Sequence, residues 1–358
     1  MNEIRSLTGL RGIAALTVFL AHLRANLVEY GIQFDLPEWF NRLFLEGGRQ
    51  VDLFFVLSGF IMALTYKSWF TSELTWNGAW LFWRRRFARI YPLHAVMLVV
   101  VACAVLAAGH LKISTTNGLD RFNFSELIPY FLLIQAWGVW IDGPGNWNPA
   151  AWSVSIEVMA YLLFPVWLHY QIKRSDRYPL GFFLFYVIVG FVLNYYLSWG
   201  LAGWSGIARG LSEFGLGAVL VSLVDRPIPK WLGTNPGAIC AIFILGASYL
   251  LFDHAVFLIA VAGAIFIMAS YRDNVISRFL SKTPFFFLGE ISYSIYLGHF
   301  LFGSIAIRLI KPTWMIESPF NLTVGLIGIV AFVLIGSTIS YYAIEKPGRS
   351  FLRRNTSK

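Results

Sequence analysis

Charged residues are scarce in this sequence of 358 residues, where aspartate, glutamate, lysine and arginine together make up 13%. A soluble globular domain carries about 25% charged residues, so the composition excludes a soluble protein. The hydrophobic share of 57% indicates a polytopic membrane protein instead. The net charge of +9 would suit a nucleic-acid partner, but the basic residues gather in short loops between apolar runs, so we set nucleic acid aside.

Cysteine is nearly absent, since only Cys103 and Cys240 occur, both inside apolar runs and without metal-like spacing. We therefore expect neither a disulfide framework nor a zinc site from these cysteines, and we interpret both thiols as buried structural side chains. We also expect no metal site and no bound cofactor elsewhere in the chain. Low-complexity tracts and repeats are also missing, so we expect no soluble domain. The first apolar run follows Met1 to Arg5 without a small-residue cleavage site, which predicts that it is not a removable signal peptide.

Long apolar runs, in contrast, fill the chain. Those long enough to span a bilayer occupy residues 7–27, 50–66, 87–109, 152–170, 180–198, 206–224, 236–252, 255–271, 284–309 and 321–343. A further run, Leu127 to Ile141, is shorter and is interrupted by Pro129, Gln135 and Gly138. These residues weaken the case for a full crossing.

The basic residues decide whether the short run crosses. If it does not, the loop containing Lys173, Arg174 and Arg177 and the basic tail both face the cytoplasm, as the positive-inside rule requires. The sequence thus predicts an all-α, polytopic transmembrane helix bundle with about ten crossings, one re-entrant or surface segment and both termini cytoplasmic. Residues 1–350 would form the membrane-embedded domain and residues 351–358 a basic cytoplasmic tail. Membrane lipids are expected contacts, and nothing here predicts the oligomeric state.

Two ionisable residues stand out in the first apolar run. Arg11 and His22 are eleven positions apart, which at about 100° per residue returns to within roughly 20° of the same helix face. They are separated by about 16 Å along a hydrocarbon core of about 30 Å. Ionisable groups within a bilayer usually face a cavity or a partner, so the pair is a candidate functional site. Arg11 as a topology anchor, and His22 at the far interface, are the alternatives.

Asp52 opens the second run at the level of His22. A carboxylate there can orient a histidine and stabilise its protonated form, although an interfacial helix cap is the competing interpretation. Arg86 and Arg89 share a helix face at the cytoplasmic end of the third run. With Arg11 they would form a phosphate clamp, and a purely topological basic cluster is the alternative.

Further polar residues lie in the later runs. Ser153 and Glu157 are four apart on one helical face, and Glu157 needs a partner across the bundle, for which His22, Arg11 or a substrate hydroxyl are candidates. Another cluster places Tyr293, Tyr296 and His299 within two turns. It would support the substrate site or hydrogen-bond between helices.

Several of these stretches resemble one family of membrane enzymes. They are Gly9 to Ala15 with Ala21-His22, Val51 to Phe60, Arg86 to Pro92, Trp152 to Glu157, Ser292 to His299, and Glu345-Lys346-Pro347. Together, and in this order, they are similar to the integral-membrane acyltransferase family 3, from about residue 5 to the tail.

The resemblance implies an enzyme of the bacterial plasma (inner) membrane that transfers an acyl group, usually acetyl, from cytoplasmic acyl-CoA to a hydroxyl of a cell-envelope glycan or a related molecule. It points to Arg11, His22, Arg86 and Arg89 as functional residues. Two departures matter: the family often has a second acid after the glutamate, where this sequence has Val158, and some members carry a fused hydrolase-like domain that we do not expect here.

The mechanism we expect is vectorial. Arg11, Arg86 and Arg89 would hold the CoA phosphates while the pantetheine arm carries the thioester inward to His22. As general base, His22 would take the proton of the acceptor hydroxyl, with Asp52 or Glu157 orienting its ring; an acyl-histidine intermediate is the variant. The rival function is a secondary transporter or flippase of a glycan or lipid-linked substrate, which the lack of repeated halves disfavours.

Overall fold

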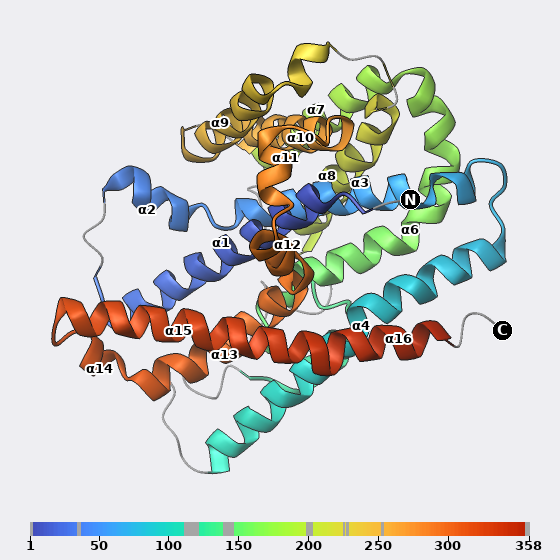
Figure 1. The fold of residues 1–358 in the computed structure, drawn as a ribbon. Coiled ribbons are helices and arrows are strands. Elements are labelled where there is room, and N and C mark those ends of the chain that lie inside the picture. Colours follow the sequence, from blue (N-terminus) through green and yellow to red (C-terminus); the bar gives the residue numbers. More distant parts are fainter. Residues whose placement is uncertain are drawn as a thin grey trace.

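The computed structural model describes residues 3–33, 37–110, 122–138, 147–197, 203–224, 226, 229–251 and 254–354. Every regular element in these ranges is helical, which confirms the all-α prediction (Figure 1). The helices are α1 (Arg5–Glu29), α2 (Glu38–Leu45), α3 (Arg49–Phe70), α4 (Trp76–His110), η1 (Phe124–Glu126), α5 (Leu127–Phe131), α6 (Ala151–Arg177), α7 (Pro179–Leu197), α8 (Gly203–Val224), η2 (Lys230–Gly233), α9 (Asn235–Leu251), α10 (His254–Ser270), α11 (Val275–Leu280), α12 (Thr283–Glu290), α13 (Ser292–Ile310), α14 (Pro312–Met315), α15 (Pro319–Ser340), the π-helical turn η3 (Tyr341–Glu345) and α16 (Lys346–Arg354).

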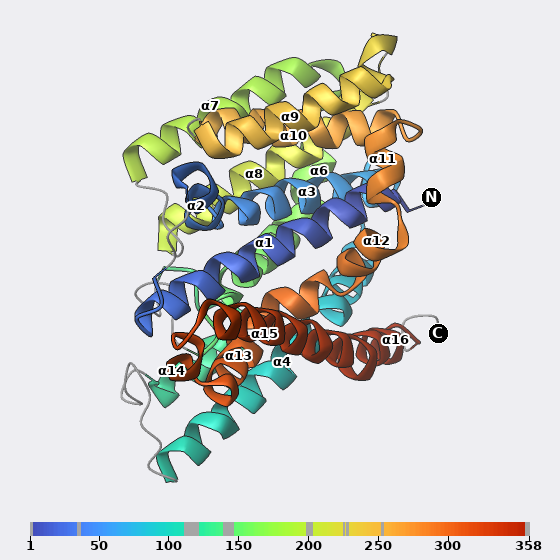
Figure 2. The ribbon, with the colours of Figure 1, turned by 60° about the vertical axis from the view of Figure 1, so that its left-hand side comes forward.

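Within the described ranges, seven helices are long and apolar enough to cross a membrane, and α7, α9 and α10 are shorter apolar helices. Each of the ten predicted runs coincides with helix. The start of α1 and the end of α16 lie at the same end of the bundle in both views (Figures 1 and 2). The number of crossings and the cytoplasmic side remain predictions from the loop charges.

The short run does not form a spanning helix in its described part. The helix α5 ends after five residues, and residues 132–138 form turns in which Leu133 has a φ of 57° and Gly138 a φ of 80°. Gln135 is buried and donates to the Ala151 carbonyl at 2.9 Å. The Ala136 amide donates to Ser155 Oγ at 3.3 Å, and Ser155 Oγ donates to the Leu133 carbonyl at 2.8 Å, so protein groups satisfy part of this irregular backbone. Residues 139–141 of the predicted segment lie outside the described residues.

The helix α1 crosses the middle of the bundle, where it packs against α2, α3, α10, α11, α12 and α13 (Figure 2). Its contact with α12 is close because both helices have glycine at the crossing: a Cβ on Gly289 would collide with the Thr8 carbonyl. The same holds where Gly59 of α3 meets the backbone of α8 at Phe214. Small residues at such crossings let two membrane helices approach to backbone contact.

Three details differ from the sequence predictions. The run 284–309 is not one helix, since α12 ends at Glu290 and α13 begins at Ser292. The third helix begins at Trp76 rather than near residue 87, so Arg86 and Arg89 lie inside α4 rather than at its end. Cys103 and Cys240 are exposed rather than buried, because the outer faces of α4 and α9 are themselves apolar, as they would be against lipid.

Candidate active site

The histidines of α1 and α13 meet each other. Nε2 of His299 lies 3.2 Å from Nδ1 of His22, and the two rings stack with centroids 5.1 Å apart. His299 is 3% exposed, whereas His22 is half-buried. The ring of Phe300 packs on His22 at 4.7 Å. One histidine of the pair is therefore locked in the core and the other can be reached.

The partners of the pair determine which ring nitrogens carry protons. Nδ1 of His299 lies 3.2 Å from the Ile295 carbonyl, which can only accept a hydrogen bond. Nδ1 of neutral His299 therefore donates, its Nε2 accepts, and the donor to that Nε2 is Nδ1–H of His22. This arrangement leaves Nε2 of His22 as the nitrogen with a free lone pair. It is the geometry of a base oriented by a second group.

At a second level of α1, Arg11 ties this helix to the end of α12, directly before α13 begins. Its Nη2 donates to the Gly289 carbonyl at 2.8 Å, and Ser292 Oγ donates to that same carbonyl at 2.8 Å. Nε of Arg11 is buried without a hydrogen-bond partner among the described residues. The guanidinium is therefore fixed at one end and retains donors for an anion.

The first half of α4, which carries the arginines, lies at the end of the bundle where α1 begins (Figure 1). Arg86 is 8% exposed, and its Nη2 donates to Tyr66 Oη at 2.9 Å while its Nη1 lies 3.3 Å from Met62 Sδ. Arg89 is half-buried and is an electrostatic neighbour of Arg11. The structure thus brings Arg89 of α4 close to Arg11. Arg86, on the same helix as Arg89, is anchored by Tyr66 and Met62 of α3.

Glu157 of α6 faces hydroxyl groups rather than His22. Its Oε1 accepts from Ser58 Oγ at 2.5 Å and from Tyr161 Oη, and the Tyr161 carbonyl accepts from the Trp83 indole at 3.0 Å. Its hydrogen-bond partner across the bundle is therefore Ser58 of α3, which was not among the predicted candidates, whereas the candidate Arg11 is an electrostatic neighbour.

The polar stretch of α13 reaches several different elements. Its contacts are Tyr293 Oη to the Ile90 carbonyl of α4 (2.8 Å), Ser294 Oγ to Glu345 of η3 (2.8 Å) and Tyr296 Oη to Ser153 Oγ of α6 (2.8 Å). Because His299 of α13 also contacts His22 of α1, the helix α13 connects α1, α4, α6 and η3. Hydrogen bonding between helices, the alternative considered for Tyr293 and Tyr296, describes these contacts.

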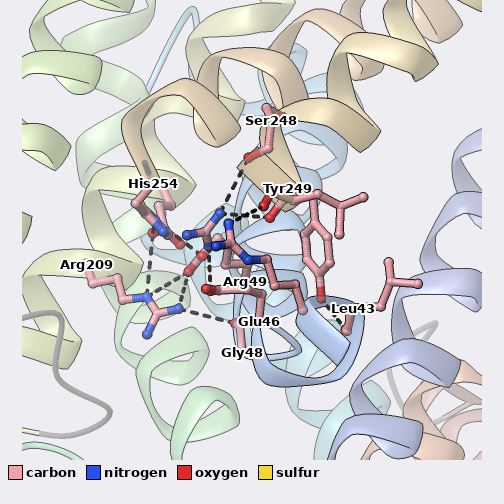
Figure 3. Close-up of polar contacts among 12 residues, drawn as sticks. Leu43, Glu46, Gly48, Arg49, Arg209, Ser248, Tyr249 and His254 are labelled. Atoms are coloured by element: carbon pink, nitrogen blue, oxygen red, sulfur yellow. Dashed lines mark hydrogen bonds and ion pairs between the residues drawn. The ribbon is translucent and has the colours of Figure 1, made fainter. Parts of the chain in front are cut away.

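Asp52 lies in a different cluster, with Arg209, Glu213 and His254. Arg209 contacts Asp52 Oδ1 through Nε at 2.7 Å and Nη2 at 2.5 Å. Nε2 of His254 lies 3.3 Å from Asp52 and 3.5 Å from Glu213. Figure 3 shows Arg209 and His254 converging on this cluster from α8 and α10, next to the Arg49 and Glu46 ion pair.

The predicted pairing of Asp52 or Glu157 with His22 is therefore wrong, because His299 occupies that position. Asp52 is completely buried, and a buried carboxylate needs a charged partner. The α8 helix, packed against α3, supplies Arg209, which is 157 residues away in the chain. This ion-pair cluster fixes α3, α8 and α10 relative to one another.

Comparison with known sequences identifies the chain. A sequence model of the acyltransferase domain of family 3 matches residues 4–342, nearly the whole chain. The chain belongs to this acyltransferase family. It is 27% identical to the acyltransferase MdmB of Streptomyces mycarofaciens, over 98% of this chain and 93% of that protein.

Two other relatives of this acyltransferase carry more specific names. A protein of Staphylococcus aureus strain COL, provisionally named an O-acetyltransferase, is 26% identical over 98% of this chain and 58% of its own length. YrhL of Bacillus subtilis, provisionally named a peptidoglycan O-acetyltransferase, is 25% identical over 98% of this chain and 56% of its own length. The chain thus spans somewhat more than half of these two proteins. No solved structure matches.

Sequence reasoning missed several buried ionisable residues of this acyltransferase, among them Arg209, Glu213 and His254, and it named Glu345 only as part of a family stretch. Arg209 and Glu213 stand four apart inside an apolar run, which is the same signal that singled out Arg11 and Glu157. His254 and Glu345 lie at run ends, where an ionisable residue is ordinary. Only their burial, at 6% and 1% exposed, distinguishes them.

Proposed function

We propose that this membrane acyltransferase moves an acyl group, most simply acetyl, from cytoplasmic acyl-CoA to a hydroxyl of a cell-envelope or exported glycan. The family membership and the names of the Staphylococcus and Bacillus relatives support an O-acetyl product, and the latter name supports a saccharide acceptor. A bacterial plasma membrane is the location that suits this reaction, since donor and acceptor then approach from opposite faces.

The contact between His22 and His299 carries the proposal. Nε2 of His22 takes the proton of the acceptor hydroxyl, and the resulting oxyanion attacks the thioester carbonyl. The C–S bond then breaks, and the imidazolium returns its proton to the leaving thiolate. While His22 is positively charged, His299 Nε2 accepts a hydrogen bond from its Nδ1, so the charge is stabilised without an acid beside the ring.

The arginines supply the donor site in this proposal. Arg11 lies eleven residues before His22 on α1, about 16 Å along the helix axis, which is roughly the reach of a pantetheine arm. Arg11, Arg86 and Arg89 would hold phosphate at the end of the bundle where α1 begins, and the thioester would then lie at the level of His22.

The decisive experiment measures acyl transfer and acyl-CoA hydrolysis by the purified full chain. His22→Ala is expected to fold and insert normally and to lose at least about a hundredfold in kcat. His110→Ala is the matched control, because this histidine is exposed at the end of α4, and it should retain full activity. Near-normal turnover by correctly inserted His22→Ala would remove the mechanism, and a wild-type chain that neither transfers nor hydrolyses would remove the function.

A further inference from the structure

The helix α16 lies beside the first half of α4, with the two chains running in opposite directions (Figures 1 and 2). The approach is close at Gly348, where an added Cβ would lie 2.6 Å from Cβ of Pro92. Any side chain at residue 348 would push the helices apart. The position of α16 against the first half of α4 is thus fixed by the close packing of Gly348 on the Pro92 ring.

One face of this C-terminal segment carries charge toward α4. Glu345, Arg349 and Arg353 follow one another at intervals of four residues, so they form a single stripe along the helix. The strongest electrostatic neighbours of Arg349 include Arg89 and Arg86. Arg353 has Arg86, Arg89 and the Tyr66 hydroxyl as neighbours. The stripe therefore faces the arginine pair of α4.

The charges of this region do not balance. Arg349 has three arginines but one carboxylate, Glu345, among its strongest neighbours. Glu345 is 1% exposed and is already shared, because Arg89 and Arg11 are also close to it and Ser294 donates to its Oε2 at 2.8 Å. Arginines gathered in a partly buried region repel one another, so a bound anion would stabilise them.

We propose that Arg349 and Arg353 bind the 3′-phosphate of acyl-CoA, a phosphate monoester, while the deeper arginines of α1 and α4 hold the diphosphate. The inference rests on the proposed function. Because the diphosphate is joined directly to the pantetheine arm, it lies nearer to His22, and the 3′-phosphate lies further out. Arg349 and Arg353 are on α16, which ends at the end of the bundle where α1 begins (Figures 1 and 2), so they are placed for the outer part of the donor. Forked guanidiniums suit such a phosphate.

The test uses acetyl-CoA and 3′-dephospho-acetyl-CoA as paired probes on the full chain in nanodiscs. The wild type should bind acetyl-CoA at least about tenfold more tightly than the dephospho donor, because charge-assisted hydrogen bonds to the phosphate are lost. Arg349→Gln combined with Arg353→Gln should reduce this preference to near one and leave Kd for the dephospho donor unchanged. Lys346→Gln is the matched control on the same helix, since its Nζ lies over the Tyr342 ring at 5.3 Å.

The outcomes separate this inference from the proposed function. If the wild type has no preference, or the double variant retains it, the assignment is overturned. An equal loss for both donors also overturns it and assigns the arginines to lipid phosphate or to packing. If the wild type binds neither donor, the proposed function fails as well. Should the double variant not fold, Arg349→Lys keeps the charge but not the fork and is expected to lose part of the preference for the 3′-phosphate; an unchanged preference would contradict the proposal.

Discussion

The hydrogen bond between His22 and His299 makes a sharp prediction for His299. Phenylalanine at this position would keep a ring of similar size in a side-chain site that is 3% exposed, between Phe19 and Phe300. It would remove the acceptor for Nδ1–H of His22. Among the described residues, His22 would then keep only its backbone hydrogen bond to Val18, while the donor and acceptor sites stay intact.

The magnitude follows from the charge that His22 carries during the reaction. A hydrogen bond to a charged group contributes about 1.5–3 kcal/mol, and each 1.36 kcal/mol of barrier is about tenfold in rate. His299→Phe should therefore reduce kcat by roughly ten- to a hundredfold. KM for acyl-CoA should remain unchanged, because His299 acts through His22 and does not contact the phosphates.

Steady-state kinetics on purified protein, with thermal unfolding as a check on folding, can measure both quantities. His299→Gln is the conservative variant, since an amide oxygen can accept from Nδ1–H of His22, and it should recover part of the loss. Wild-type kcat in His299→Phe would refute the positioning role. Equal losses in His299→Phe and His299→Gln would show that the role is packing.

Three other expectations follow from the structure. Arg86→Lys and Arg89→Lys should each raise KM for acyl-CoA about tenfold or more at unchanged acceptor KM, because lysine keeps the charge but lacks the fork; unchanged KM would make them topology anchors. A cysteine at Lys173, in an otherwise cysteine-free chain, should be labelled from the cytoplasmic side alone, and labelling by an impermeant reagent from outside would refute the ten-crossing topology. Asp52→Asn should destabilise the fold by about 3–5 kcal/mol, because it leaves Arg209 buried beside a neutral group, with kcat per folded molecule retained; a stable but inactive variant would restore Asp52 to the chemistry.

Much of the fold could be predicted because a bilayer imposes simple rules on sequence. Apolar length located the helices, and Pro129, Gln135 and Gly138 showed that the short run is not a spanning helix. The break between α12 and α13 was not predicted, although Gly289, Glu290 and Ser292 interrupt the apolar run around Ile291. Only the packing of α12 across α1 requires the chain to turn there.

The candidate site could be predicted only as far as the single helix. Periodicity on α1 placed Arg11 and His22 on one face, and the close contact with α13 confirms that His22 has a polar partner. The identity of that partner depends on which helices are neighbours in space. From the sequence alone, His299 and Asp52 are equally reasonable partners for His22. The structure excludes Asp52, because Arg209, from a distant part of the chain, forms an ion pair with it.

The two contacts of α1 with the segment around α13 also limit the size of the donor. Arg11 is bonded to the Gly289 carbonyl and His22 to His299, so α1 is held at both levels and cannot slide along its axis relative to its partner. The distance between Arg11 and His22 along α1, about three helical turns, is therefore fixed. A donor with a shorter arm between phosphate and thioester would not bring its thioester as far as His22, and one with a longer arm would carry the thioester past His22. If acyl-CoA is the donor, as proposed, the enzyme would select it by the length of the arm between phosphate and thioester, and the outer half of the bundle would accommodate the acyl group beyond the thioester.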